Sequence, residues 1–458
     1  MKKTSAHQPS AKTARFVSGS IMRHVCVMSA TGATGLFAVS LVDFLTLVYI
    51  AQSGDHRLTA GVGAALFIMF FCRSVNIGLM IAVAALVSRT LGQGKRWEAR
   101  HIATASVILL SFGAFLISML VLPFLPILLP LVGATPEIYD PAREYLMISL
   151  PSNGIAGLGM GFSAILRAHG EARRSMMVTL TGGAVTAICS PILIFIFKLD
   201  VMGAALSTVL SNCTIALTGL YFCLKKLQCL ASPRLADIRI FLKPIFVVGL
   251  PAIATNLATP VSNAFVARMV AEFGEKSYAA FTIMDRLYPL VFCGFFALSG
   301  CIGPILGQNW GAQRFDRMRL ALKDATLLCA LYVLVMSSFL YLGKDFIIYW
   351  FRAEDETAEL IRFFCMTCGI FWFFNGLLFC SNASFNNLGF PFMATFFNWG
   401  RATLGTIPFA WIGSYYFGVK GIYAGTILGV MLFGACALIM AFRTVEILKE
   451  RAAGSERK

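Results

Sequence analysis

The sequence predicts an all-α, polytopic membrane protein made of two similar halves. Hydrophobic residues make up 58% of the 458 residues and charged residues only 13%, whereas soluble domains carry roughly 25% charged residues. Apolar stretches long enough to cross a ~30 Å hydrocarbon core as helices recur along the chain. Glycine turns also recur at one fixed offset. Together these observations predict twelve transmembrane helices in two pseudo-symmetric six-helix lobes.

The predicted spans follow one another in two sets of six. In the first half, apolar stretches fall near 25–50, 60–87, 102–130, 143–166, 175–197 and 201–224. In the second half they fall near 243–270, 279–306, 323–350, 360–384, 394–417 and 421–442. Because six crossings return the chain to its starting side, we expect parallel repeats, related by an axis along the membrane normal.

These spans divide the chain into five parts. We expect a cytoplasmic N-terminal segment (1–24), a first lobe (25–224), a cytoplasmic linker (225–242), a second lobe (243–442) and a basic cytoplasmic tail (443–458). The apolar stretch after the N-terminal segment is too long for the core of a signal peptide, and no small-residue cleavage site closes it. We therefore expect no cleavage.

Two glycine turns repeat along the chain. The turn around Gly92 has its counterpart around Gly311, and the turn at Gly170 has its counterpart at Gly389. Both pairs are 219 residues apart. A constant offset of this size indicates two copies of one structural unit, each about half of the chain.

The formal net charge of +16 reflects membrane topology rather than a nucleic-acid partner. Basic residues gather before the first span and after the second, fourth, sixth, eighth and twelfth spans, as at Arg96 and Arg173. Acidic residues such as Glu137 and Glu356 occupy opposite connections. The positive-inside rule makes the basic face, and with it both termini, cytoplasmic. Contact with anionic lipids is a secondary role of this charge.

Motifs of nucleotide-driven transport and of enzymatic catalysis are missing from the sequence. The segment 92–96 lacks the early glycine and the final Ser or Thr of a phosphate-binding loop. Most cysteines are scattered through apolar stretches, which favours packing over metal or redox chemistry. We therefore expect no metal, no cofactor and no enzymatic activity, with an ion gradient driving uphill transport. A membrane-embedded enzyme is the alternative, and turnover without transport would favour it.

Some ionisable residues lie deep within the predicted spans. Asp43 lies in the first span, Arg73 in the second, and Asp285 and Arg286 in the eighth. A charge at the bilayer centre costs roughly 2.5–3.5 kcal/mol on insertion scales, so these residues are expected to face the bundle interior or a wet cavity. Desolvation favours the neutral form of an acid, which suits Asp43 to proton exchange. A structural pairing of Arg73 with Asp43 or Asp285 is the alternative.

Several of these features occur together in one known family. They are the two lobes, the first-span Asp43, the turns 91–94 and 307–312, and the segment 383–389. In these features, over residues 20 to 442, the chain resembles the multidrug and toxic compound extrusion (MATE) transporters, in particular their DinF-like branch. The resemblance implies a bacterial inner-membrane antiporter that expels organic, often cationic, compounds in exchange for protons or sodium ions.

The resemblance also implies a coupling site in the first lobe. Asp43 corresponds to the family's first-span aspartate, which binds a cation or a proton, and Thr208 to its sixth-span threonine. Where many members have asparagine and then aspartate in the fifth span, this chain has Thr186 and Ser190. One carboxylate and neutral oxygens remain. This set weakens the case for sodium and favours a proton carried by Asp43.

The second lobe departs further from the family pattern. The seventh-span glutamate of NorM-like members corresponds to Thr259 and their tenth-span aspartate to Asn375, so neither acid is present. Asn263 occupies the position that the internal repeat relates to Asp43. Charge coupling is therefore expected in the first lobe alone. The predicted cavity residues are Arg73, Asn263, Asp285, Arg286 and Asn375.

The function expected from these features is proton-coupled export of cationic amphipathic compounds by alternating access, in a monomer embedded in the bilayer. Sodium is the alternative coupling ion. The alternative function is that of a flippase of the same superfamily, which moves lipid-linked precursors. In that case Arg73, Arg286 and Arg401 of this chain would hold the phosphates of the precursor.

Overall fold

The computed structural model describes residues 14–51, 56–132 and 134–455, and all regular structure in these ranges is helical. The first half contains η1 (Arg15–Val17), α1 (Ile21–Ala51), α2 (His56–Gly92), α3 (Arg96–Val121), η2 (Leu122–Phe124), α4 (Leu125–Leu131), α5 (Pro136–Ser149), α6 (Asn153–Ala168), α7 (Ala172–Pro191), η3 (Ile192–Ile196), α8 (Asp200–Tyr221) and η4 (Phe222–Lys226). The second half contains α9 (Leu235–Ala271), α10 (Glu275–Val291), α11 (Cys293–Gly311), α12 (Phe315–Trp350), α13 (Asp355–Phe363), η5 (Phe364–Cys368), α14 (Gly369–Phe371), α15 (Phe373–Asn387), α16 (Pro391–Gly400), η6 (Arg401–Gly405) and α17 (Ile407–Ser455).

The helices form fewer uninterrupted spans than the twelve apolar stretches suggest. In the described ranges, eight helices are long and apolar enough to cross a membrane, or nine if the bent rod α13–α15 counts as one. The stretch 143–166 is broken beside Pro151, and the stretch 279–306 is broken at Phe292. Conversely, α17 contains the end of one span and the whole of the next, because the chain reverses at Gly418 (φ 60°, ψ −140°). Joined across the breaks and divided at Gly418, the helices make twelve rods, as the sequence predicts.

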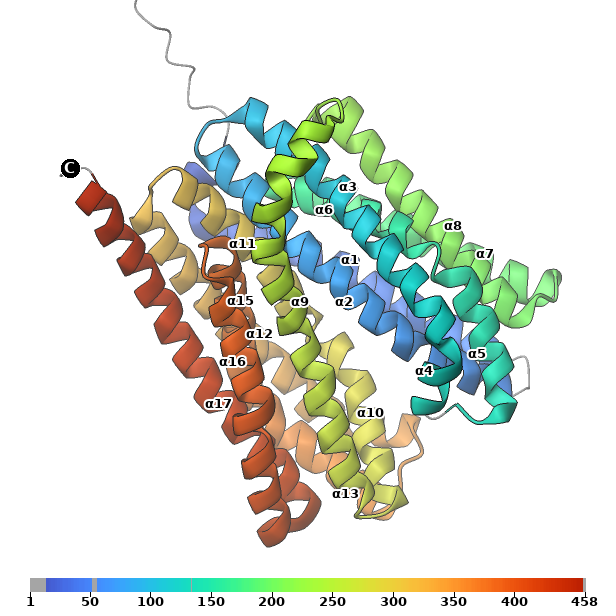
Figure 1. The fold of residues 1–458 in the computed structure, drawn as a ribbon. Helices are drawn as coiled ribbons and strands as arrows, with labels where there is room; N and C mark the ends of the chain where they lie inside the picture. Colours follow the sequence, from blue (N-terminus) through green and yellow to red (C-terminus); the bar gives the residue numbers. More distant parts are fainter. Residues whose placement is uncertain (1–13, 52–55, 133, 456–458) are drawn as a thin grey trace, which may run out of the picture.

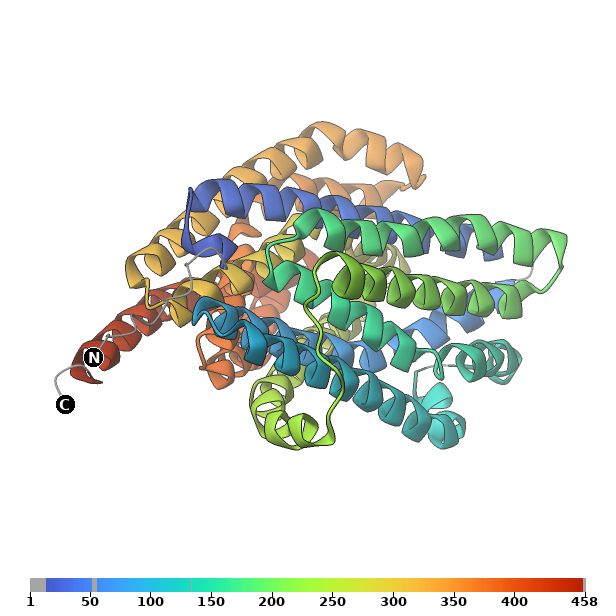
Figure 2. The same cartoon turned by 90° about the horizontal axis from the view of Figure 1, so that it is seen from above.

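The two lobes lie side by side and meet mainly through α1, α2, α9 and α11. Figure 1 shows the lobes together at the end that carries the start of α1 and the end of α17, and splayed apart towards the other end. We call the first of these the basic end, after Arg89, Lys95, Arg173, Arg314 and Lys449 in the helix ends and turns there. Within this arrangement α1 contacts both α7 of its own lobe and α12 of the second lobe (Figure 2).

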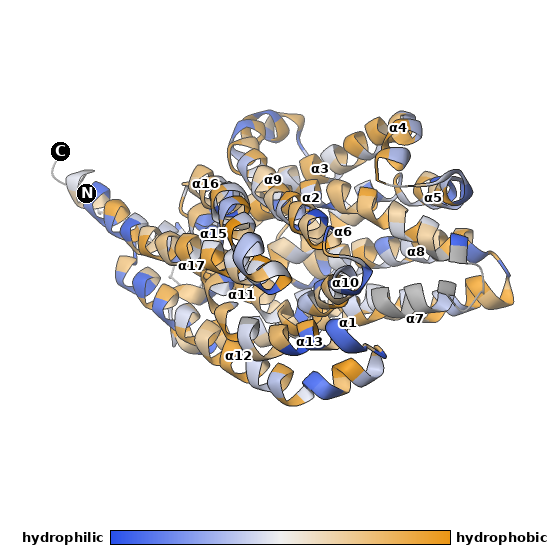
Figure 3. Ribbon diagram, turned by 90° about the horizontal axis from the view of Figure 1, so that it is seen from below, coloured by the Kyte–Doolittle hydropathy of each residue, from blue (hydrophilic) through white to orange (hydrophobic). Residues whose placement is uncertain are grey.

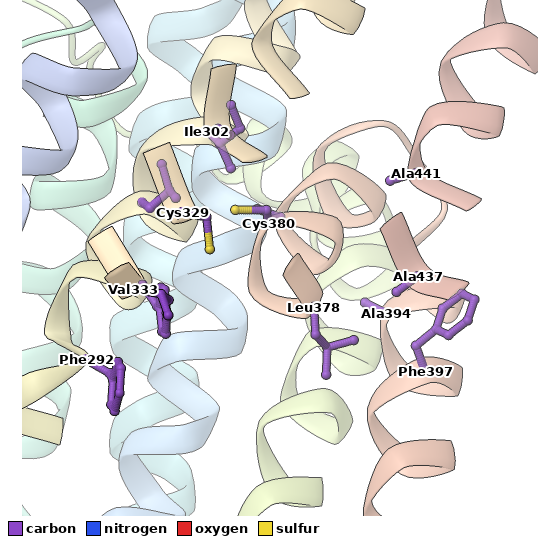
Figure 4. Close-up of a cluster of buried hydrophobic side chains, with 14 of the residues drawn as sticks. Phe292, Ile302, Cys329, Val333, Leu378, Cys380, Ala394, Phe397, Ala437 and Ala441 are labelled. Atoms are coloured by element: carbon purple, nitrogen blue, oxygen red, sulfur yellow. The ribbon is translucent and has the colours of Figure 1, made fainter. Parts of the chain in front are cut away.

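Apolar side chains fill the interior of each lobe and also cover much of the helix surface. In the second lobe, Phe292, Cys329, Leu378 and Phe397 belong to one buried cluster (Figure 4). Many large apolar side chains remain exposed, such as Leu342, at 79%. Figure 3 shows hydrophobic residues along the helices of both lobes. An apolar surface of this extent fits a protein whose surroundings are lipid rather than water.

The cysteines in the described part of the chain are free thiols, and most are buried. Cys365, spaced from Cys368 as in a CxxC pair, is buried in η5. The small-residue run 153–161 packs closely against neighbouring helices. A Cβ atom added to Gly157 would lie 2.7 Å from a methyl group of Leu110, and one added to Gly159 would lie 2.4 Å from Ile215.

The connection between the lobes is short and is held by α3. Because α9 begins at Leu235, well before the apolar stretch 243–270, only residues 227–234 are non-helical. The Arg100 guanidinium donates to the Leu230 carbonyl oxygen from Nε at 3.0 Å and from Nη2 at 2.7 Å. At the start of α9, Asp237 lies 2.6 Å from Nδ1 of His101. These bonds fix the second lobe's first helix to the first lobe.

Candidate functional site

The predicted coupling residues of the first lobe lie on helices that pack against each other. α1 and the rod α7–η3 run in the same direction and touch at three levels, namely Gly35 with Thr179, Val39 with Gly183, and Tyr49 with Phe195. Asp43 lies between the second and third contacts, so its backbone is level with the part of α7 that carries Thr186 and Ser190. The side chain of Asp43 lies outside the described residues.

A hydroxyl network surrounds this part of α7. Ser190 is fully buried and donates from Oγ to Ser207 Oγ at 2.9 Å. Thr208, one residue further along α8, donates to the Ala204 carbonyl oxygen at 3.1 Å. Its Oγ1 also lies 3.3 Å from the Tyr145 hydroxyl. Thr186 donates to the carbonyl oxygen one turn before it. The structure therefore brings Ser190 and Thr208 into one α7–α8 network of neutral oxygens.

Tyr145 is a member of this network that sequence reasoning missed. It lies in α5 and is 5% exposed. Its stretch, 143–166, carries no pattern that separates this tyrosine from an ordinary core residue. Only the packing of α5 on α8 brings its hydroxyl to Thr208.

The predicted cavity residues do not form one cluster. Arg73 in α2 is half-buried and has no ion pair with any side chain in the described ranges, Asp285 included. Asp285 in α10 is exposed and accepts a hydrogen bond from Asn263 Nδ2 at 3.3 Å. Asn375 Nδ2 donates to the Tyr288 hydroxyl at 2.6 Å. The side chain of Arg286 lies outside the described residues.

The second lobe contains a buried arginine beside these residues. Arg401 begins η6, a π-type turn, and is 7% exposed. Its Nη2 donates to Thr259 Oγ1 at 3.1 Å, and Tyr288 lies near the guanidinium. From the sequence, Arg401 is expected only as one of the phosphate-holding arginines of the flippase alternative. Its proximity to Thr259 could not be found from spacing, because 142 residues separate the two.

The glycine turns of the two lobes cross each other at the basic end. A Cβ atom on Gly92 would lie 2.1 Å from the carbonyl oxygen of Gln308, and one on Gly311 would lie 2.1 Å from that of Arg89. The Arg89 guanidinium lies over the Trp310 ring, 3.6 Å from its centre. Glycine is required here because the backbones are in contact. The repeat-related turns thus form the seal between the lobes.

The segment η1 reinforces this seal and was also missed by sequence reasoning. Phe16 is 1% exposed and packs into the apolar cluster of the second lobe. Its N–H donates to Gln308 Oε1 at 2.9 Å, while Gln308 Nε2 donates to the Ala168 carbonyl oxygen of the first lobe at 2.7 Å. Arg15 Nη1 donates to the Gly170 carbonyl oxygen at 2.9 Å. One segment therefore joins both lobes at the basic end.

The geometry offers neutral oxygens, buried charges and a closed end, but no ready metal centre. In the described part of the chain, no three His, Cys, Asp or Glu side chains lie close enough to hold a metal ion.

Comparisons with known proteins agree with this arrangement. The chain is 24% identical over 448 residues to a protein of Shewanella oneidensis named FAD transporter, covering 96% of this chain and 98% of that protein. It is 22% identical over 432 residues to the multidrug export protein MepA of Staphylococcus haemolyticus, covering 93% and 94% of the two chains. Its fold matches the Vibrio cholerae MATE transporter VcmN in the bent form, with a TM-score of 0.87 at 20% identity over 93% of this chain and 98% of that one.

The profile of the MatE family matches residues 33–192 and 251–412, one segment in each lobe. These ranges include most of the helices that form the first-lobe network and the crossing glycine turns. A multi-pass helical fold of twelve rods in two lobes, with a family match in each lobe, identifies the chain as a member of the MATE family of transporters.

Proposed function

We propose that this protein exports cationic amphipathic organic compounds across the bacterial inner membrane in exchange for protons, with Asp43 as the proton carrier. The basic end then faces the cytoplasm, as the positive-inside rule requires. The observation that carries the proposal is the parallel packing of α1 on α7, which sets the backbone of Asp43 level with Thr186 and Ser190. Residues 175–197 contain no charged side chain, so Asp43 is the only acid that these two helices supply at this level.

The closed basic end corresponds to an outward-facing state in this proposal. A deprotonated Asp43 attracts a cationic cargo between the lobes, and protonation from outside neutralises the charge that holds it. The cargo leaves, the protonated carrier turns inward, and the proton is released to the cytoplasm. A membrane potential of 100 mV contributes about 2.3 kcal/mol for each charge moved across it, which is sufficient to bias such a cycle.

Everted vesicles that contain the protein test the proposal directly. Respiration acidifies their interior, and an exported compound then dissipates the pH gradient as protons leave. Dyes and cationic drugs should dissipate it only in vesicles with the protein. FAD belongs in the panel because one relative is named FAD transporter. A panel in which no compound reduces the gradient would reject proton-coupled export.

Sodium is expected to have little effect on this exchange. Ser190 donates its hydroxyl proton to Ser207, and the site offers one carboxylate with neutral oxygens, whereas hard cations favour several carboxylate and carbonyl ligands. Replacing potassium by sodium at fixed pH should change the initial rate by less than about twofold, by the same ligand argument. Ammonium chloride, which collapses the pH gradient, should stop export in both salts. A strict sodium requirement would reverse the assignment of the coupling ion.

A further inference from the structure

The guanidinium of Arg401 is buried in the second lobe with part of its donor capacity unused. Its Nη2 donates to Thr259, whereas Nε is buried and has no hydrogen-bond partner. Arg401 forms no ion pair with any carboxylate in the described ranges. A buried guanidinium without a counter-anion is unfavourable, because its desolvation is not offset by an opposite charge. The free donors therefore favour binding of an anion.

The neutral side chains of Thr259 and Tyr288 lie near the guanidinium of Arg401, whereas Asp285, on the same helix as Tyr288, is exposed and accepts from Asn263. Thr259 and Asn375 carry no charge, and the Tyr288 hydroxyl accepts from Asn375 Nδ2 at 2.6 Å. The Tyr288 ring lies 3.8 Å from the ring centre of Trp372. The remaining donors of a planar guanidinium match the geometry of carboxylate and phosphate groups. The aromatic rings beside it offer contact to a flat apolar skeleton.

The site lies at the edge of accessible space rather than in a sealed core. Thr259, Tyr288 and Asn375 are only partly buried. Asn263, one turn beyond Thr259 on the same face of α9, is exposed. From the basic end, α9 runs along α2 of the first lobe and carries these residues beyond the seal. A compound between the lobes can therefore approach this side of Arg401.

We propose that Arg401 binds an acidic group of the transported compound, a carboxylate or a phosphate. This inference rests on the proposed function, because the cargo enters between the lobes. Among the cationic amphipathic compounds of the proposed function, Arg401 together with Asp43 in the first lobe favours those that also carry an acidic group, as aromatic zwitterions do, over those that carry a positive charge alone. The first lobe recognises the amine, and the second lobe recognises the acid.

The test uses two dyes that differ in one group. Rhodamine 19 carries a free carboxylate, and rhodamine 6G is its ethyl ester. Binding of each dye to the purified full-length protein is measured by fluorescence polarisation, without an ion gradient. The wild type should bind rhodamine 19 more tightly than rhodamine 6G. Arg401→Gln should lower the affinity for rhodamine 19 about tenfold or more, because one charge-assisted interaction is lost. Its affinity for rhodamine 6G should be unchanged.

Two further variants separate binding from folding. Thr259→Glu retains Arg401 but places a carboxylate within its reach, so it should also remove the preference for rhodamine 19. Lys344→Gln removes a positive charge of α12 that pairs with Asp345 at 3.6 Å, and it should leave the preference intact. The inference would be overturned if Arg401→Gln lowered the affinity for both dyes equally, or if Thr259→Glu still preferred rhodamine 19. Because no gradient is involved, failure of proton coupling at Asp43 would leave this result unaffected.

Discussion

Asp43→Asn should abolish proton-coupled export while leaving the protein in the membrane. The substitution retains side-chain size and hydrogen-bonding capacity but removes the group that alternates between neutral and charged. The asparagine amide is neutral, as a protonated aspartate is, so it brings no charge into the apolar bundle and folding should survive. Export is measured as dissipation of the pH gradient in everted vesicles, and the amount of protein by immunoblotting of the same vesicles.

Asp43→Glu is the matched control for this experiment. It restores a carboxyl group one methylene further along, so coupling should return in part, with an altered dependence on pH. Thr186→Val and Ser190→Ala remove neighbouring oxygens and should leave proton coupling largely intact, because the proton is carried by the carboxyl group. Export at the wild-type rate by Asp43→Asn would show that another group carries the proton.

Gly92→Ala should stop the transport cycle by preventing closure of the basic end. A Cβ atom at this position would lie 2.1 Å from the Gln308 carbonyl oxygen, which is a backbone atom and has little freedom to move. Overpacking typically costs about 1–3 kcal/mol, so the closed state should become about fivefold to 150-fold less populated. Efflux should fall accordingly, and Gly311→Ala should behave alike, because its Cβ would meet the Arg89 carbonyl oxygen at the same distance.

Gly300→Ala provides the control on the same helix as Gly311. A Cβ atom there meets no heavy atom within 4 Å, so export and thermal unfolding should both match the wild type. The seal variants should retain near-normal unfolding of the separate lobes, since the overlap lies between lobes and not within one. If Gly92→Ala exports normally, contact of these two backbones is not a required state of the cycle.

The spans could be predicted because their signal is local. Hydrophobic stretches near 60–87 and 323–350 correspond to α2 and α12, which extend beyond them at one end or both. Helix ends were less predictable. Pro151 and Phe292 interrupt two spans, and Gly418 turns two predicted spans back on each other within one assigned helix. These interruptions depend on backbone geometry that hydropathy does not report.

The candidate site was predictable only in part. The sequence singles out Asp43, because an acid in an apolar stretch is expensive wherever it lies. The sequence does not indicate a role for Tyr145, because this tyrosine lies in an ordinary hydrophobic span. It also does not indicate the contact between Thr259 and Arg401. The repeat identifies the glycines of the seal as equivalent turns, but their direct contact depends on how the two lobes pack.

The sequence by itself determined the membrane class, the two-lobe repeat and the residues whose charge is unusual, because hydropathy, charge and periodicity are properties of neighbouring residues. The tertiary structure decided which distant residues meet. It brought Phe16 to Gln308 across 292 positions and Arg401 to Thr259 across 142. Such contacts depend on how twelve rods pack, since helices that are apolar on all sides carry no pattern that specifies their neighbours.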